Sequence, residues 1–509
     1  MATTDQEVRR RQKEVEKIKK METSPNSTSA SYASDDRSIS SKTTVVEPSK
    51  AVPEVTTTKA VRYSHTYVVH TTIRASPLSK ESPEQNYRGF FNLSMLLLAV
   101  SNTRLIVENY MKYGFILSLP FSGHERMNLH LKWAFFSFVW QASTVVFAFF
   151  IEKLSVKSFQ RNVPNDFRIK MLHAVNTSLM ITVPTAICWN ILSNPVISAL
   201  TLFGATTLML KTISYALVNA DLRREVLSPN SPNQRCEEPS STDASLDVDA
   251  AFDIDRTPYP TNITFSNLAY FIFAPTLCYQ PSFPRTTRFR KTFFAKRLLE
   301  FSVGIAAMYL LGGQYAAPTL RNSLAALDNL DFVHLFERVL KLSVVSVVIW
   351  LLMFYSFFHC ALNMLAEIMR FGDRRFYLQW WNAKDIAEYW RLWNTPVHNW
   401  GKRHIYMPLI VTYKVSPTVA SIGVFTISAL LHELLIGVPT RCLNGWAFAG
   451  MMLQLPMILQ SRALIPLRAK NEKLFDTVGN YVFWLSFTIV GQPAAVLVYY
   501  SHWYKRNSL

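Results

Sequence analysis

The chain has 509 residues, of which 49% are hydrophobic and 13% aromatic, with a formal net charge of +18 at pH 7. Polar residues gather in 1–85, whereas most of 90–503 alternates apolar runs with basic loops, which argues against one soluble domain and predicts several membrane spans. The charge does not indicate nucleic acid, because basic residues beside apolar spans favour the cytosolic face and attract anionic headgroups. The five cysteines are scattered without a CxxC pair, which argues against a disulfide framework.

The N-terminal arm, residues 1–85, is predicted to be cytosolic and disordered. Residues 1–20 are charged throughout and could form a short helix, but they contain no cleavable signal peptide, so the first span has to act as the insertion signal. Residues 21–85 are rich in Ser and Thr and lack helical periodicity. We therefore expect residues 1–80 to be dispensable for chemistry.

Residues 86–509 are predicted to form one all-α membrane domain with about nine spans of ~20 residues each. The predicted spans are 91–118, 133–151, 171–193, 196–217, 298–319, 339–365, 415–438, 445–464 and 478–500. The basic loops at 152–170, 283–297 and 462–473 then lie on the same side as the arm, and the positive-inside rule makes that side cytosolic. An odd number of spans leaves the C-terminus in the lumen.

The loop at 218–262 is acidic and rich in Ser and Pro, which predicts a flexible cytosolic insertion. It contains the sequon Asn262-Ile-Thr, which we expect to be unused on the cytosolic side. No internal repeat of solenoid or transporter type is visible in the chain.

The region 366–411 does not have the pattern of a span, but it is dense in Trp and Tyr. Four of its residues recur at roughly helical spacing: Ile386, Trp390, Trp393 and Val397. This spacing predicts an amphipathic helix in the cytosolic interface. An interfacial aromatic belt is a simpler explanation, but a belt does not require the polar Asn394 and His398 on the same short element.

His432 lies in the apolar run 424–438 and is followed by Glu433. Charged groups at membrane depth cost roughly 2.5–3.5 kcal/mol on insertion scales, so they are seldom accidental. The unperturbed pKa of histidine, about 6.5, makes His432 a candidate proton carrier; the alternative is a structural histidine bonded to a neighbouring helix. Ser428, four residues earlier, shares the face of His432, whereas Glu433 points about 100° away.

Three further residues could complete a polar site within the membrane. Met451 and Gln454 share a helix face by their spacing, and Gln492 is a third buried polar candidate. Each alone is typical of contacts between membrane helices, and convergence on one histidine would make a site. The chain has no HExxH, GxSxG, Walker or dinucleotide-binding pattern, so neither a metal site nor a cofactor is predicted.

Six stretches carry a resemblance to a known family: Asn86-Tyr-Arg-Gly89, Phe273–Tyr279, Phe376–Asn382, Trp393–His398, Ser428–Glu433 and Trp446–Pro456. Taken in order, from about Asn86 to Tyr504, they resemble the membrane-bound O-acyltransferases. Sterol acyltransferases share blocks similar to the third and fifth stretches, whereas the first and last stretches resemble the type 1 diacylglycerol acyltransferases. Two residues depart from the family pattern: Gln379 stands where Asp is usual, and Leu434 where Tyr is usual.

The resemblance implies transfer of a fatty acyl group from acyl-CoA, the co-substrate, to the free hydroxyl of 1,2-diacylglycerol. It assigns His432 as general base and Asn394 as donor to the oxyanion or the leaving thiolate. For binding of acyl-CoA, the candidate residues are Trp393, His398, Tyr406, Lys414 and Ser428, as the resemblance implies. For positioning the acceptor, or for supporting the residues that contact it, the candidates are Glu433, Met451, Gln454 and Gln492. The aromatic motif comprises Phe376, Tyr377, Trp380, Trp381 and Asn382.

The same resemblance implies an endoplasmic reticulum membrane protein among membrane lipids, forming a homodimer or homotetramer. Two alternatives remain open at this stage. A sterol or a long-chain alcohol could replace diacylglycerol as acceptor with the same chemistry. A membrane transporter would use the polar residues to line a pathway, although the missing repeats and the Trp-rich block argue against it.

Overall fold

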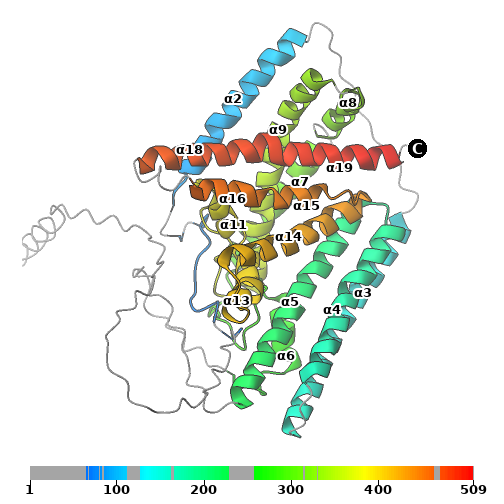
Figure 1. Ribbon diagram of the computed structural model, residues 1–509, viewed down its shortest axis with the longest axis vertical. Coiled ribbons are helices and arrows are strands. Elements are labelled where there is room, and N and C mark those ends of the chain that lie inside the picture. The colour runs from blue at the N-terminus through cyan, green and yellow to red at the C-terminus, as the bar shows by residue number, and fades with distance from the viewer. Residues whose placement is uncertain are drawn as a thin grey trace, which may run out of the picture. The chain divides into compact units, whose positions relative to one another are not determined.

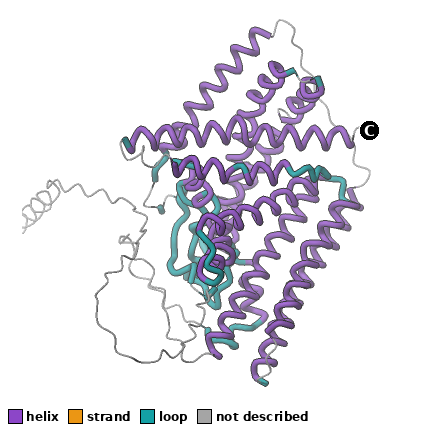
Figure 2. The backbone as a smooth tube through the Cα atoms, in the orientation of Figure 1, coloured by secondary structure: helices purple, strands orange, loops and turns teal. Residues whose placement is uncertain are grey.

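The computed structural model describes residues 65–66, 68–79, 81–82, 85–111, 127–161, 166–227, 257–312, 316–329, 331–463 and 471–507. Within these residues every extended regular element is a helix, which confirms the all-α prediction (Figures 1 and 2). The charged segment 1–20 and most of the predicted disordered arm lie outside the described residues.

The helices follow one another in chain order. The first half contains α2 (Arg88–Met111), α3 (Met127–Gln160), α4 (Asp166–Asn190), α5 (Pro195–Leu227), α6 (Phe265–Phe273), α7 (Lys291–Leu311), α8 (Ala317–Asp328), α9 (Phe332–Phe354), the π-helix η3 (Tyr355–Ala361) and α10 (Leu362–Ile368). The second half contains the 3-10 turn η4 (Trp380–Asn382), α11 (Ile386–Leu392), α12 (Thr395–Gly401), the π-helix η5 (Lys402–Tyr406), α13 (Met407–Val411), α14 (Pro417–Thr440), α15 (Trp446–Met452), α16 (Gln454–Ala463), α18 (Glu472–Leu485), the π-helix η6 (Ser486–Gly491) and α19 (Gln492–Asn507).

Six helical stretches in the described residues are long and apolar enough to cross a membrane: Asn128–Gln160, Asp166–Asn190, Pro195–Val226, Phe332–Ile368, Pro417–Thr440 and Leu474–Arg506. Several predicted spans coincide with them, so the protein is a multi-span membrane protein, but the count of nine is not confirmed. Of the other predicted spans, 298–319 is interrupted where α7 ends at Leu311, and 445–464 is broken at Leu453 between α15 and α16. The predicted span 91–118 is described as helix only as far as Met111.

The aromatic motif 376–382 is the centre of the largest buried cluster. Trp380 is fully buried, and its ring centroid lies 5.1 Å from that of Trp350, 4.9 Å from that of Phe354 and 5.6 Å from that of Trp484. Aromatic pairs at such separations stabilise a fold by about 0.5–1.5 kcal/mol beyond their buried area. The motif therefore joins α9 and α18 through packing.

The same motif fixes the beginning of α2. The Asn382 side-chain oxygen accepts the backbone N–H of Gly89 at 2.5 Å, and the Trp381 indole donates to the carbonyl of Asn86. A β-carbon at Gly89 would lie only 1.6 Å from the carbonyl oxygen of Trp381, so only glycine fits. Gln379 Oε1 accepts from Asn382 Nδ2 at 3.1 Å, so the residue that replaces the usual Asp still supplies an acceptor oxygen.

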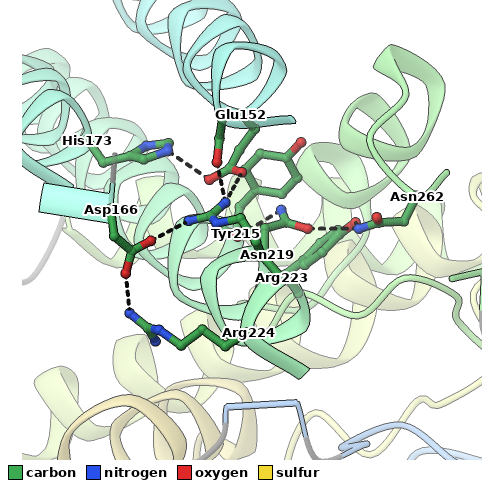
Figure 3. Close-up of polar contacts among 10 residues, drawn as sticks. Glu152, Asp166, His173, Tyr215, Asn219, Arg223, Arg224 and Asn262 are labelled. Atoms are coloured by element: carbon green, nitrogen blue, oxygen red, sulfur yellow. Dashed lines mark hydrogen bonds and ion pairs between the residues drawn. The ribbon is translucent and has the colours of Figure 1, made fainter. Parts of the chain in front are cut away.

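The predicted loop at 218–262 begins too early, because α5 continues to Leu227, whereas residues 257–262 at its other end do form loop and turns. Figure 3 shows the reason: polar side chains at the end of α5 meet charges from α3 and α4. Arg223 pairs with Glu152 at 3.4 Å and with Asp166 at 3.1 Å. The amide of Asn262 donates to the side-chain oxygen of Asn219 at 2.8 Å, and Asn262 is 1% exposed, so the sequon side chain is inaccessible.

The end of the predicted arm is packed against the membrane domain. We call residues 65–66 and 68–79 the strap. The backbone N–H of His65 donates to Asp221 at 2.6 Å, and the His70 ring bonds both Asp373 (2.8 Å) and Thr276 (2.7 Å). The folded domain therefore begins well before the predicted boundary at residue 85.

Candidate active site

His432 is held in one orientation by its own helix. Its Nδ1 lies 2.8 Å from the backbone carbonyl oxygen of Ser428, one turn earlier in α14. A carbonyl oxygen only accepts hydrogen bonds, so Nδ1 carries the hydrogen of the neutral ring and Nε2 carries the lone pair. No described residue bonds Nε2, which makes this atom available to accept a proton. The backbone of Ser428 makes the close contact, whereas its hydroxyl lies 3.4 Å from Nδ1.

The helix that carries His432 packs against the elements expected to face acyl-CoA. Leu431, beside His432, lies in a cluster with Trp400 of α12 and Ile405 of η5. A β-carbon at Gly423 would meet the Leu409 side chain at 3.3 Å, so α14 and α13 are in close contact. The general-base candidate and the acyl-CoA-binding candidates thus belong to one packed unit.

Asn394 lies at a helix end, which corrects the prediction of a single amphipathic helix over 386–397. The structure has two helices, α11 and α12, with Asn394 as the N-cap of α12 and Pro396 in the first turn. Asn394 Oδ1 accepts the N–H of Val397 at 3.2 Å. Because the oxygen is used for the cap, any donor role of Asn394 falls to its amide Nδ2 hydrogens.

His398 lines a cavity of about 240 Å³ between the strap, the aromatic motif and α12. Arg74, Arg375 and Arg391 also line this cavity together with one carboxylate, that of Asp373, so that basic side chains outnumber acidic ones. Burial, with smaller contributions from Lys402 and Arg391, lowers the pKa of His398 to about 4. The imidazole is therefore neutral at pH 7 and can contact a ligand through a hydrogen bond but not through a positive charge.

The remaining acyl-CoA candidates occupy different environments. Tyr406 ends η5 and is half-buried, and Lys414 is exposed in the turn before α14 with φ of 55°. Trp393 stacks on Tyr389 at 5.9 Å and contacts Phe358 at 5.4 Å, so it belongs to the aromatic core. Tyr406 and Lys414 lie on elements that precede α14 in the chain, whereas the ring contacts of Trp393 are with the aromatic cluster.

The acceptor-side candidates are less closely grouped than predicted. Met451 and Gln454 do not share one helix, because the chain turns at Leu453; Gln454 Nε2 donates across this turn to the carbonyl of Gly450 in α15 at 3.2 Å. Gln492 begins α19 after η6 and is half-buried. Contacts of α14 with both α15 and α19 bring these segments around the His432 helix, but within the described part of the chain no hydrogen bond joins Met451, Gln454 or Gln492 to His432.

Glu433 faces away from His432, as its position in the helix predicts. Its carboxylate accepts backbone N–H groups of Gly445, Ala447 and Phe448 and the hydroxyl of Tyr499. Tyr499 was missed by the sequence analysis, because a Tyr pair near the end of an apolar span is typical of an interfacial belt. The strap was missed because its bonds join residues more than 150 positions apart.

Comparison with known proteins identifies the class to which this fold and site belong. Residues 165–501 match the membrane-bound O-acyltransferase family, and the chain belongs to that family.

Its relatives narrow the class. The chain is 37% identical to diacylglycerol O-acyltransferase 1A of Glycine max over 487 residues, which cover 94% of this chain and 91% of the relative. It is 38% identical to diacylglycerol O-acyltransferase 1 of Homo sapiens over 441 residues, or 86% and 84% of the two chains. With the protein of the same name from Arabidopsis thaliana it shares 37% identity over 441 residues, or 86% and 78%.

Proposed function

We propose that this protein transfers the acyl group of acyl-CoA to the free hydroxyl of 1,2-diacylglycerol, forming triacylglycerol and CoA. The observation that carries the proposal is the orientation of His432, whose Nδ1 is committed to the Ser428 carbonyl while Nε2 keeps its lone pair. The relatives described above are named diacylglycerol O-acyltransferases, and they match this chain over most of their length, which supports this acceptor.

The reaction needs a base but no acyl-enzyme, because a thioester is already activated. Nε2 of His432 takes the proton of the acceptor hydroxyl as its oxygen attacks the thioester carbonyl. The resulting oxyanion requires a donor, and the amide hydrogens of Asn394 are suited to it because its oxygen already caps α12. When the carbon–sulfur bond breaks, the CoA thiolate takes the proton from His432, and the base is restored.

The two substrates reach the site by different routes. The basic cavity beside His398 suits the phosphate groups of CoA, which approach from water, and its arginines lie outside the candidate spans. Diacylglycerol is apolar and arrives laterally from the bilayer. Glu433, Met451, Gln454 and Gln492 are the residues proposed to shape or support the acceptor side.

The proposed setting is the endoplasmic reticulum membrane, with the N-terminus in the cytosol and the C-terminus in the lumen. The cytosolic N-terminus follows from the basic loops at 152–170 and 283–297, and the lumenal C-terminus requires an odd number of spans. We also propose a homodimer or homotetramer. The transporter alternative is not retained, because the chain belongs to an acyltransferase family.

The acceptor is tested by offering diacylglycerol, a sterol and a long-chain alcohol in parallel to the purified protein with radiolabelled acyl-CoA. Labelled triacylglycerol is the expected main product, and the His432→Ala variant provides the background. Efficient esterification of the sterol or of the alcohol without triacylglycerol formation would contradict the proposed acceptor.

A further inference from the structure

Glu433 sits in a cage of four hydrogen-bond donors that come from two other helical segments. Gly445 N–H reaches Oε1 at 2.9 Å, and the N–H groups of Ala447 and Phe448 reach Oε2 at 3.0 and 3.1 Å. The hydroxyl of Tyr499, from α19, donates to Oε2 at 3.1 Å. This set of donors satisfies a carboxylate in an apolar surrounding without a basic side chain.

The Tyr499 hydroxyl closes the cage in two ways. It donates to the carboxylate and accepts the N–H of Ala447 at 2.7 Å, so it connects both partners of one bond. Tyr499 is 4% exposed, which keeps water from replacing it. No other described side chain donates to the Glu433 carboxylate.

The surroundings of the cage are closely packed. A β-carbon at Gly437 would lie 3.1 Å from Glu433 Oε1 and 2.9 Å from the carbonyl oxygen of Cys442. The cage therefore fixes the chain reversal between α14 and α15 as well as the carboxylate.

The cage around Glu433 lies directly beside the proposed general base. Glu433 follows His432 in α14, and the three N–H donors form the beginning of α15. Met451, three to six residues after those donors, is buried in the same short helix. A shift of the α15 start would move the acceptor-side segment relative to His432, and a misplacement of about 1 Å can reduce a rate about a hundredfold.

We propose that Tyr499 is a positioning residue for the acceptor: acting through Glu433, its hydroxyl holds the beginning of α15 in register with the helix that carries His432. The proposal rests on the proposed function for its kinetic readout. Neither Tyr499 nor Glu433 needs to touch the reacting atoms, because both carboxylate oxygens are engaged by the protein.

The test compares Tyr499→Phe with Tyr500→Phe, the same change at the next residue. Tyr500 packs against a different cluster, beside Leu320 and Leu497. A hydrogen bond to a charged group is worth about a factor of ten, so kcat/KM for diacylglycerol should fall about tenfold in Tyr499→Phe. The KM for acyl-CoA should stay within about twofold of wild type. Tyr500→Phe should leave both values unchanged.

A double-mutant cycle with the isosteric Glu433→Gln shows whether Tyr499 acts through the carboxylate. In the Glu433→Gln background, Tyr499→Phe should have at most about a threefold effect, since the charge-assisted bond is already lost. Full additivity, an unchanged kcat/KM for diacylglycerol in Tyr499→Phe, or an equal loss in acyl-CoA affinity would overturn the proposal.

Thermal unfolding of the wild type, the two single variants and the double variant measures how far the Tyr499–Glu433 bond stabilises the protein, and it does not depend on the identity of the acceptor. Coupling between the two substitutions in the unfolding temperature is expected even if the wild-type protein esterifies another alcohol. Absence of triacylglycerol synthesis by the wild type would contradict the proposed function alone, whereas absence of coupling in unfolding would contradict the proposal that Tyr499 acts through Glu433.

Discussion

Gly89→Ala should destabilise the protein although it places a better helix former inside α2. Alanine usually gains about 0.5–1 kcal/mol over glycine in a helix. Here the added carbon would lie 1.6 Å from the Trp381 carbonyl oxygen and 2.8 Å from the Asn382 nitrogen, so the backbones have to separate by about 2 Å. Overpacking of this kind costs about 1–3 kcal/mol, and loss of the Gly89–Asn382 bond adds about 1 kcal/mol. The net expectation is a loss of about 2 kcal/mol.

The assay is thermal unfolding of the detergent-purified protein, with Gly312→Ala as the matched control. Gly312 caps α7 in right-handed helical geometry, and a β-carbon there meets no described atom within 4 Å. The control should unfold at or slightly above the wild-type temperature, whereas Gly89→Ala should unfold several degrees lower. Equal unfolding temperatures for the two variants would refute the close approach of α2 to the aromatic motif.

Three further outcomes are expected. Deletion of residues 1–59 should preserve transferase activity. Deletion of residues 1–82 should lower both the unfolding temperature and the activity, because it removes the buried hydrogen bonds of the strap. Equal activity of the two truncated proteins in a transferase assay would contradict this. The pKa of His398 is lowered to about 4, so the unfolded chain binds a proton near pH 6.5 that the folded protein binds only near pH 4. Because the unfolded state binds more protons in this range, the contribution of His398 to the free energy of unfolding should fall by about 1 kcal/mol from pH 6.5 to pH 5.5. His398→Asn should remove that part of the pH dependence in denaturation measured at both pH values, and an unaltered slope would argue against a buried neutral imidazole. Gln379→Leu should cost about 1 kcal/mol of stability and Gln379→Glu much less, since only the first loses the acceptor for Asn382; unfolding temperatures decide between these.

The features that sequence predicted well depend on local composition. Apolar runs of sufficient length identify spans such as α14 and place His432 at membrane depth without knowledge of any partner. The burial of Trp380 and Trp381 agrees with a dense aromatic block, although the sequence did not indicate that this block anchors α2.

The errors arise where distant residues decide the structure. The polar end of α5 was predicted as loop, because the carboxylates that pair with Arg223 lie more than 50 positions away in the chain. The strap has no periodicity, since it is held by single bonds such as that between His70 and Asp373. The break at Asn394 had a local signal, because an N-cap residue stands two positions before Pro396. The prediction of one continuous helix relied instead on the helical spacing of the aromatic residues.

The central claim is that His432 is the proton acceptor, and the most direct measurement is the single-turnover rate of acyl transfer by His432→Ala with saturating acyl-CoA and diacylglycerol. The rate should fall by about 10²–10⁴-fold, while equilibrium binding of acyl-CoA and the unfolding temperature remain close to wild type. Ser428→Ala is the matched control, because it keeps the backbone carbonyl that orients the ring and should cost much less. A folded His432→Ala variant that transfers the acyl group at a near-wild-type rate would contradict the mechanism and leave His432 with a structural role.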